Sequence, residues 1–261
     1  PNQLTDSTVC VLIGHSIEAI TSAVVLASLG QRVHLYADKM LLTQQIQQYG
    51  FEHHLQALWQ MYEQQQVIIS KELPASADML IKGYEAAGHN ETDVQSTVTL
   101  YWLFLDSVKL AWTEDSWIIA FNQSHQQALP VIMSGIEQLG YVADLAQRLQ
   151  RAWVYYVPFV FLQDGDAYSS MLNPSLWLLG EKTASSSQHL NVFKPLMQHA
   201  RATHHADIAT IEFARSSIMA MLATRVSFMN EMSRLADSQN VDISQVSRIM
   251  GLDERVGSSY L

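Results

Sequence analysis

The stretch from Asp207 to Ala236 is the feature that most constrains how this chain folds. Apolar residues recur in it at intervals of three and four positions, the spacing of one helix face: Ile211, Ala214, Ile218, Leu222, Val226, Met229 and Met232. We expect Asp207 to cap this helix, because its carboxylate accepts hydrogen bonds from the free N–H groups of the first turn. Residues 218–223 include no charged side chain. A helix that is apolar on all sides is normally covered on all sides, which predicts a second domain or a second subunit against it.

Composition and charge narrow the class of protein. The 261 residues are 48% hydrophobic and 15% charged, which is enough for a large core in one domain or in a domain with an appendage. The formal net charge is −10, with acidic and basic residues mixed along the chain, whereas a nucleic-acid partner requires clustered Lys and Arg. No apolar run approaches the roughly 20 residues that span a bilayer, and no signal pattern opens the sequence. With Cys10 as the single cysteine, we expect a cytoplasmic α/β protein that binds neither membrane nor nucleic acid.

The beginning of the chain has the pattern of a βαβ unit. Val9–Ile13 is a short apolar run that ends at Gly14, as a buried parallel strand does. Ile17–Leu29 follows as a helix with Ser16 as its N-cap, and Arg32–Tyr36 is a second strand. In a dinucleotide-binding fold the turn at the start of such a helix holds the pyrophosphate.

The rest of the chain continues as alternating elements. Further strands are predicted at Val67–Ser70, Thr97–Leu105, Trp117–Phe121 and Trp153–Pro158. Further helices are predicted at Ala75–Ala87, Ser107–Thr113 and Val131–Gln150, the last interrupted at Gly140. Asp242–Gln245 has the pattern of a capping box for a final helix that ends at Gly251. The alternation predicts a doubly wound parallel sheet followed by helices.

Two segments carry a resemblance to a known family. FARSSIMAMLATRVSFMNEMSRLAD, followed by VDISQVSRIMGLDERVG, resembles the central helical domain of the UDP-glucose/GDP-mannose dehydrogenase family, whose members oxidise a nucleotide sugar to its uronic acid with NAD. Val160–Gly180 is similar to the family pattern P-E-F-L-x-E-G-x-A…L-x-P…G. The resemblance covers nearly all of this chain. It implies a Rossmann-like NAD-binding-type domain over residues 1–195, and a long central helix with a small all-α, 6-phosphogluconate-dehydrogenase-like dimerisation domain over 196–261.

The cofactor turn departs from the family's G-x-G-Y-V-G-L. If NAD binds, the resemblance places its contacts on the turn and on the end of the second strand: Gly14, His15, Ser16, Ile17 and Asp38. Ser16 replaces the glycine that lets the backbone approach the pyrophosphate, and Glu18 adds a negative charge that repels a diphosphate. The family's ribose-binding acid falls on Ala37, one position before Asp38. This pattern favours a Rossmann-like unit that binds no dinucleotide, with NAD binding as the alternative.

The catalytic positions that the resemblance implies are also altered. The family's glutamate before glycine falls on Asp164, either an acid/base group or a turn-capping carboxylate, and its lysine and asparagine fall on Arg215 and Met219. Ser124 is the hydroxyl nearest the family's catalytic threonine but is not assigned that role. The family's nucleophilic cysteine and third domain follow the Gly251–Gly257 motif and lie beyond this sequence. We therefore expect a naturally short, degenerate relative, with a piece of a longer enzyme as the alternative.

A histidine-rich link precedes the long helix, in MQHARATHHAD. No two of His199, His204 and His205 are three or four positions apart, so a helical link would not stack a pair as metal ligands. We expect solvated histidines and no metal site.

Two functional hypotheses follow from these patterns. The first is a non-catalytic family member that serves as a binding or assembly partner in polysaccharide production. It would be a homodimer through the long helix, with a protein or a nucleotide sugar as its partner. The second is an active NAD-dependent oxidoreductase that acts on a UDP- or GDP-sugar, or on a related alcohol, through an altered site.

Overall fold

A computed structural model describes residues 8–48, 52–65, 67–87, 97–160 and 165–257. The chain divides into two compact units, residues 1–212 and 213–261. Each unit is described by itself, and the family domain boundary predicted after residue 195 stays a prediction.

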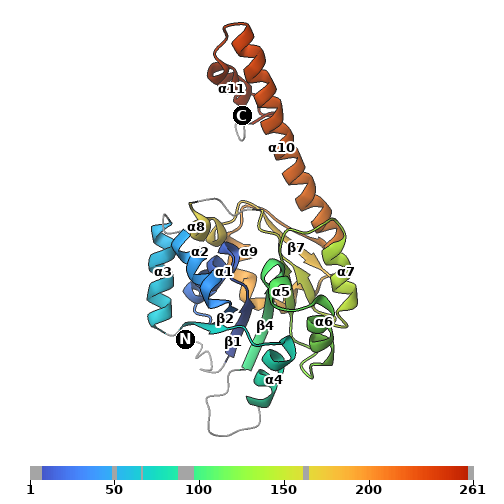
Figure 1. The fold of residues 1–261 in the computed structure, drawn as a ribbon. Helices are drawn as coiled ribbons and strands as arrows, with labels where there is room; N and C mark the ends of the chain where they lie inside the picture. The colour runs from blue at the N-terminus through green and yellow to red at the C-terminus, as the bar shows by residue number, and fades with distance from the viewer. Residues whose placement is uncertain (1–7, 49–51, 66, 88–96, 161–164, 258–261) are drawn as a thin grey trace. The chain divides into compact units, whose positions relative to one another are not determined.

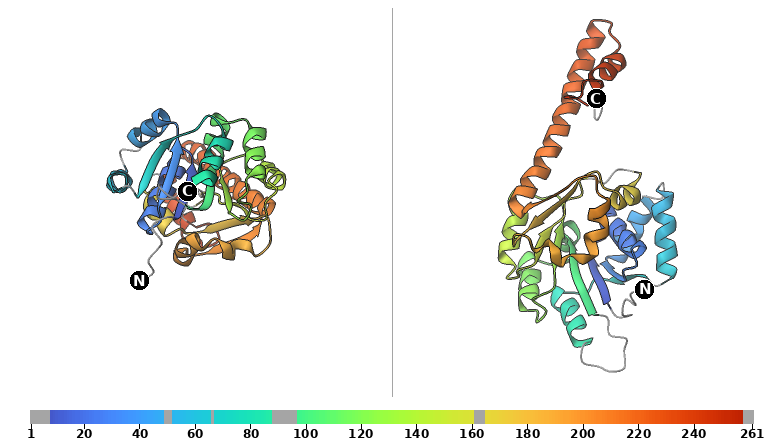
Figure 2. Two further views of the ribbon diagram at one scale, coloured as in Figure 1. Left: turned by 90° about the horizontal axis from the view of Figure 1, so that it is seen from below. Right: turned by 180° about the vertical axis from the view of Figure 1, so that it is seen from behind.

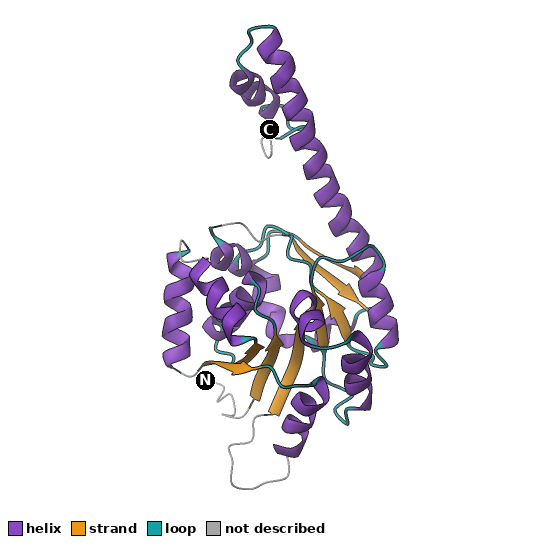
Figure 3. Ribbon diagram, in the orientation of Figure 1, coloured by secondary structure: helices purple, strands orange, loops and turns teal. Residues whose placement is uncertain are grey.

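The described part of the first unit is built on an eight-stranded sheet (Figure 3). The strands are β1 Thr8–Ile13, β2 Val33–Ala37, β3 Ile68–Glu72, β4 Thr97–Phe104, β5 Val131–Ser134, β6 Val154–Tyr156, β7 Trp177–Glu181 and β8 Thr203–Asp207. Their order is β3-β2-β1-β4-β5-β6-β7-β8, and the neighbours are parallel except for the antiparallel β6–β7 pair. The order reverses direction between β1 and β4, which is the switch point where open α/β sheets bind ligands. The predicted α/β fold, with a mostly parallel sheet, is confirmed.

Helices cover both faces of this sheet (Figures 1 and 2). They are α1 Ile17–Ser28, α2 Lys39–Gln48, α3 His53–Gln64, α4 Ala77–Ala87, α5 Leu105–Ala111, α6 Glu114–Gln123, α7 Tyr141–Arg148, α8 Ala167–Leu172 and α9 Lys194–His199, with short 3₁₀ turns at Ser186–His189 and Asn191–Phe193. Helix α1 packs against α3 and α8, and α4 packs against α6. Right-handed crossovers place these two groups on opposite faces, because the chain runs outward from β1 to β3 and then returns through β4 to β6.

The core of the first unit lies on the central strands. Residues 9–13 of β1 are all buried, as a strand covered on both faces requires. On the α1 side, aromatic rings fill the layer between sheet and helices: Trp102 lies 5.0 Å from Phe193 and 5.4 Å from Phe104 between ring centroids. No helix among the described residues is both long and apolar enough to cross a bilayer.

Two predicted elements after β4 are wrong. The segment predicted as a strand at Trp117–Phe121 lies in helix α6, and the segment predicted as a helix from Val131 begins with strand β5. Thr113 precedes two acids that favour the positive end of a helix, and the buried Trp117, Ile118 and Phe121 follow helical spacing. Residues 131–134 are buried throughout and follow a proline, which favours a central strand over a helix interior.

The histidine-rich link contains a strand that the sequence analysis did not predict. His204 and His205 lie in the edge strand β8, which pairs in parallel with β7. Asp207 ends this strand and accepts a hydrogen bond from the backbone N–H of Thr210 at 2.9 Å, so the predicted capping of the long helix is confirmed. That helix, α10, spans Ile208–Ser238.

The second unit consists of most of α10 and of α11, Ile243–Gly251. Asp242 caps α11 by accepting from the N–H of Ser244 at 2.9 Å, and the helix ends at Gly251 as predicted. Arg225 on α10 donates to the carbonyl oxygens of Val256 and Gly257 at 2.8 and 3.1 Å. These bonds hold the segment after α11 against α10.

Several apolar side chains of the long helix are exposed within the described part of the chain. Met219 and Met221 on α10 are 45% and 63% exposed. Further along α10, Phe228 and Leu235 are 47% and 56% exposed. No other part of the described residues buries these side chains.

Candidate functional site

The β1–α1 turn begins at Gly14, where the backbone is packed too closely for any side chain. A Cβ at this position would lie 2.7 Å from the Cβ of Phe104 and 3.0 Å from the Cβ of Ala19. The end of β4 therefore approaches the turn so closely that the position requires glycine. Ala19, at the third position of the fingerprint, completes the contact between helix and strand.

Donors of this turn are bound by side chains of the chain itself. The backbone N–H of His15 donates to Ser107 Oγ at 3.1 Å, and Ser107 Oγ donates to Asp106 Oδ1 at 3.2 Å. Ser16 Oγ accepts from the N–H of Ala19 at 3.4 Å, so Ser16 is the N-cap of α1, as predicted. In a dinucleotide-binding fold, N–H groups at this helix terminus face the pyrophosphate.

An open pocket of about 360 Å³ lies next to this turn, at the carboxyl ends of β1 to β4. It is lined by His15, Asp38, Lys39, Leu41, Glu72, Leu73, Pro74, Ala75, Ser107, Leu110 and Ala111. The predicted contacts His15 and Asp38 therefore line one pocket. Its position, at the switch point of the sheet, is where α/β folds of this kind bind small molecules.

Asp38 has a structural role in this pocket. Its Oδ1 accepts hydrogen bonds from the N–H groups of Met40 and Leu41, both at 2.9 Å, and so caps α2. The preceding residue, Ala37, is the last residue of β2 and is 1% exposed. One carboxylate oxygen of Asp38 is thus engaged by the backbone, while Oδ2 forms no hydrogen bond within the described residues.

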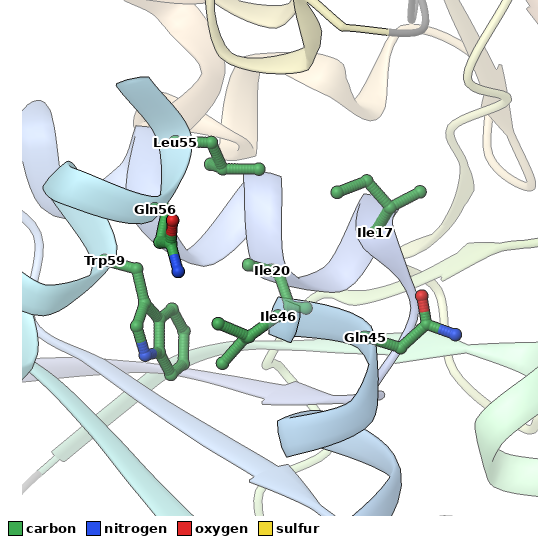
Figure 4. Close-up of a pocket in the computed structure, with 7 residues that line it drawn as sticks. All are labelled: Ile17, Ile20, Gln45, Ile46, Leu55, Gln56 and Trp59. Atoms are coloured by element: carbon green, nitrogen blue, oxygen red, sulfur yellow. The ribbon is translucent and has the colours of Figure 1, made fainter. Parts of the chain in front are cut away.

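Ile17 lies on a different surface of α1. It lines a small cavity between α1, α2 and α3, together with Ile20, Gln45, Ile46, Leu55, Gln56 and Trp59 (Figure 4). This cavity has a volume of about 10 Å³, which leaves room for at most one water. Ile17, a predicted cofactor contact, therefore lines this small cavity and not the open pocket that His15 and Asp38 line.

The predicted catalytic residues do not form one described site. Asp164 lies outside the described residues. Arg215 belongs to the second unit, is half-buried and forms no ion pair or hydrogen bond within the described residues. Met219, which falls on the family's asparagine, lies on the same helix.

The strand error conceals a position that the sequence analysis missed. Ser134 and Gly135 stand at the end of β5, a strand that the sequence analysis did not predict. Ser134 is buried; it donates to the carbonyl of Val157 at 2.7 Å and accepts from Trp102 Nε1 at 2.9 Å. The Ser-Gly pair after a short apolar run was the sequence signal for this position.

Ser124 is used in local structure. It is 4% exposed and donates to Glu85 Oε1 at 2.6 Å. The same carboxylate oxygen accepts from the backbone N–H of His125 at 2.8 Å. Glu85 thus fixes the loop after α6.

Two buried groups bear on reactivity. Burial raises the pKa of the Cys10 thiol to about 11, so it stays protonated near neutral pH and is a poor nucleophile. Burial, with smaller contributions from the charges of Lys71 and Arg32, lowers the pKa of His34 to about 4. Its Nδ1 is hydrogen bonded to the hydroxyl of Tyr84. Within the described residues, no group of three or more His, Cys, Asp or Glu side chains has the geometry to hold a metal ion.

The family motif around Gly180 serves packing. A Cβ at Gly180 would lie 3.0 Å from the Cα of Ile208 and 3.2 Å from the Cβ of Tyr156, so glycine lets β7 approach the first residue of α10. Nearby, the buried Glu52 accepts from the N–H groups of Gly165 and Ala167 at 3.1 and 3.3 Å. These contacts stabilise the fold.

Comparison with known proteins identifies relatives for this architecture. Residues 209–261 match the central domain of the UDP-glucose/GDP-mannose dehydrogenase family. A UDP-glucose 6-dehydrogenase of Rickettsia bellii is 24% identical over 158 residues, which cover 60% of this chain and 34% of that protein. The putative UDP-glucose 6-dehydrogenase YtcA of Bacillus subtilis is 33% identical over 104 residues, 39% of this chain and 24% of that protein.

Solved structures share the fold. A UDP-glucose dehydrogenase from Pyrobaculum islandicum superimposes with a TM-score of 0.69 at 18% identity and covers all of this chain. A ternary complex of a GDP-mannose dehydrogenase from Pseudomonas aeruginosa superimposes with a TM-score of 0.70 at 14% identity and covers 94% of this chain. The present chain covers 60% and 57% of these two proteins, and thus less than two thirds of their length.

Proposed function

We propose that this chain, which belongs to the nucleotide-sugar dehydrogenase family, is a non-catalytic member that acts as a binding or assembly component. The process that we infer for it is polysaccharide biosynthesis in the cytoplasm. The inference of process comes from what the family makes, since uronic acid nucleotides are precursors of such polymers. The inference of compartment comes from the single buried cysteine.

One observation carries the proposal: the β1–α1 turn is occupied by the chain's own side chains. His15 donates its N–H to Ser107, and Ser16 caps α1 with its hydroxyl. A dinucleotide would have to displace the Ser107 contact and accept the negative charge of Glu18, which lies in the first turn of α1. Both effects weaken binding of a pyrophosphate at this position.

The reacting groups support the same conclusion. Met219 stands where the family has an asparagine. Arg215 retains a positive charge but does not release its proton at physiological pH, which excludes a step that requires a neutral amine. Packing positions such as Gly14 and Gly180 keep their family residues. Packing residues are thus retained while reacting residues are replaced, which fits a chain that still needs its fold but no longer catalyses the family's reaction.

The partner that we propose first is a second copy of the chain. Met221, Phe228 and Leu235 recur at seven-residue intervals on α10 and are 47 to 63% exposed. A seven-residue spacing keeps side chains on one helix face, the geometry by which two helices pack together. An uncovered apolar stripe on this helix supports a homodimer through α10.

The test of the function is an assay for NADH formation. The chain is mixed with NAD and, in turn, with UDP-glucose, UDP-N-acetyl sugars and GDP-mannose, with an active UDP-glucose dehydrogenase assayed in parallel. The proposal predicts no NADH above the rate without enzyme. Sustained NADH formation with any of these sugars would contradict it.

The alternative is a working NAD-dependent oxidoreductase with altered contacts. The open pocket of about 360 Å³ at the switch point, with Oδ2 of Asp38 free of described hydrogen bonds, favours this alternative. It predicts that NAD raises the melting temperature, because a ligand that binds the folded state stabilises it. The non-catalytic proposal predicts no such rise.

A further inference from the structure

A layer of polar side chains lies between the sheet and α4, on the side of the sheet away from α1. We propose that this layer holds an ordered internal water that bridges Nε2 of His34 on β2 and the hydroxyl of Tyr101 on β4. The ligand of this site is thus a single neutral molecule that both donates and accepts hydrogen bonds. The inference goes beyond the proposed function, because it involves neither the cofactor turn nor the reacting groups.

Two buried polar atoms in this layer have no protein partner. His34 and Tyr101 are 5% and 0% exposed. Neither His34 Nε2 nor the Tyr101 hydroxyl forms a hydrogen bond with another group of the described residues. Buried polar groups in native proteins are normally paired with protein or with ordered water, because an unpaired group loses its hydration without compensation. Since no protein group pairs with either atom, water is the partner that we expect.

The strand register places the two side chains on one face of the sheet. Val11 of β1 pairs with His34 on one side and with Tyr101 on the other. Residues paired in this way point to the same face, and adjacent strands lie about 4.8 Å apart, so the two Cα atoms are roughly 10 Å from each other. Tyr101 points away from its neighbour Trp102, and so away from α1. The two unpaired atoms therefore belong to the same layer, on either side of Val11.

Helix α4 covers this layer with Tyr84. The hydroxyl of Tyr84 is hydrogen bonded to Nδ1 of His34 and lies 2.9 Å from the hydroxyl of Tyr36. Burial raises the pKa of Tyr84, with smaller contributions from Tyr36 and Tyr101, so the phenol of Tyr101 lies within electrostatic reach of Tyr84. Phe121 of α6 packs against Tyr101 at 5.2 Å between ring centroids. A water between His34 and Tyr101 would thus be separated from bulk solvent by α4 and α6.

Water suits these two atoms better than an ion does. In a neutral imidazole one nitrogen donates and the other accepts, whereas a phenol hydroxyl does both. A water molecule can therefore pair with His34 Nε2 and with Tyr101 in either tautomer of the ring. A metal ion is disfavoured, because the described residues contain no group of three or more His, Cys, Asp or Glu side chains that could hold one. The water would extend the hydrogen-bonded chain of Tyr36, Tyr84 and His34 across the sheet to β4.

The sign of a stability change tests the proposal. Tyr101→Phe removes only the hydroxyl. If that hydroxyl is bonded to water, the variant loses a hydrogen bond, and its melting temperature should fall by roughly 2–4 °C. If the hydroxyl is unpaired, its removal relieves a buried polar group, so the melting temperature should stay the same or rise. That second result would overturn the proposal.

Tyr155→Phe is the matched control for this measurement. Tyr155 is 0% exposed, and its hydroxyl donates to the carbonyl oxygen of Ser186 at 2.8 Å. Because this hydroxyl has a protein partner, its removal should lower the melting temperature whether or not the proposed water is bound. The proposal predicts a fall of similar size in the two variants.

A high-resolution crystal structure of the native chain locates the water directly. We expect an ordered water within about 2.6–3.2 Å of both His34 Nε2 and the Tyr101 hydroxyl oxygen. No ordered water between these two atoms, or a direct hydrogen bond from either atom to the other, would overturn the proposal.

Discussion

The backbone N–H of His15 lies 3.1 Å from Ser107 Oγ, so the β1–α1 turn and the first turns of α5 are joined by a hydrogen bond across 92 positions of the chain. Phe104, the residue before α5, packs against Gly14 so closely that a Cβ at Gly14 would lie 2.7 Å from its Cβ. The end of β4 and the start of α5 thus pack directly under the turn. The hydrogen bond between His15 and Ser107 therefore stabilises the fold and also uses a backbone N–H of the turn where the family binds its cofactor.

Ser107→Ala tests this contact. Because the hydroxyl is buried and accepts from a backbone N–H, its removal should lower the free energy of unfolding by about 1–3 kcal/mol. The measurement is urea denaturation followed by circular dichroism. Asp106→Asn is the control; it retains an acceptor oxygen at an exposed position and should cost less than about 0.5 kcal/mol. Equal losses in the two variants would argue against a buried hydrogen bond.

Gly14→Ala should destabilise the chain by about 1–3 kcal/mol or more, because the new Cβ meets the Cβ atoms of Phe104 and Ala19. Gly83→Ala is the matched control. Gly83 lies inside α4, and a Cβ added there would have no neighbouring atom within 4 Å, so alanine should stabilise the helix by about 0.4–1 kcal/mol. In thermal denaturation we expect Gly14→Ala to lower the melting temperature and Gly83→Ala to raise it. Two changes of the same sign would contradict the packing described at the turn.

His34 should make stability depend on pH. Its pKa falls from 6.5 to about 4 on folding, so the unfolded chain binds a proton between these values that the folded chain does not. Stability contributed by neutral His34 is therefore present above pH 6.5 and lost as the pH falls toward 4, by up to about 3 kcal/mol. His34→Gln should remove this part of the slope in denaturation measured from pH 7 to 4. Substitution of the exposed His125 by glutamine is the control, and an unchanged slope in His34→Gln would refute the assignment.

The apolar stripe on α10 predicts a change of oligomeric state. Light scattering should give the mass of a dimer for the native chain, and Phe228→Glu should shift it to a monomer, because a charge would be buried without a partner. Asn230→Glu places the same charge two residues away, on another side of the helix, and should leave the dimer intact. A native chain that is monomeric at micromolar concentration would contradict the proposed homodimer.

Local sequence signals predicted much of the fold. The apolar run of β1, the Ser16 cap and the periodicity of α10 each lie within one continuous stretch of sequence, and the structure has a strand, a cap and a helix at these places. The two wrong predictions, at α6 and β5, also came from local sequence signals. Trp117–Phe121 is short, apolar and β-branched in its centre, so strand and helix are hard to separate there without the capping residues.

The candidate site was harder to predict because its contacts are distant in the sequence. Nothing near His15 indicates that Ser107 accepts its N–H, and nothing near Gly14 indicates that Phe104 requires glycine there. The position of Ser134 and Gly135 was lost with the strand error, since a turn is assigned by the strand it follows. Asp38, predicted as a cofactor contact, lines the pocket, but its capping of α2 could not be predicted without knowing where that helix begins.

Isothermal titration with NAD tests the central claim most directly, namely that the β1–α1 turn has lost its place for a pyrophosphate. The account predicts no saturable heat with the native chain at millimolar NAD, and a measurable signal with Ser16→Gly/Glu18→Gln. Saturable binding of NAD to the native chain with a micromolar Kd would contradict it.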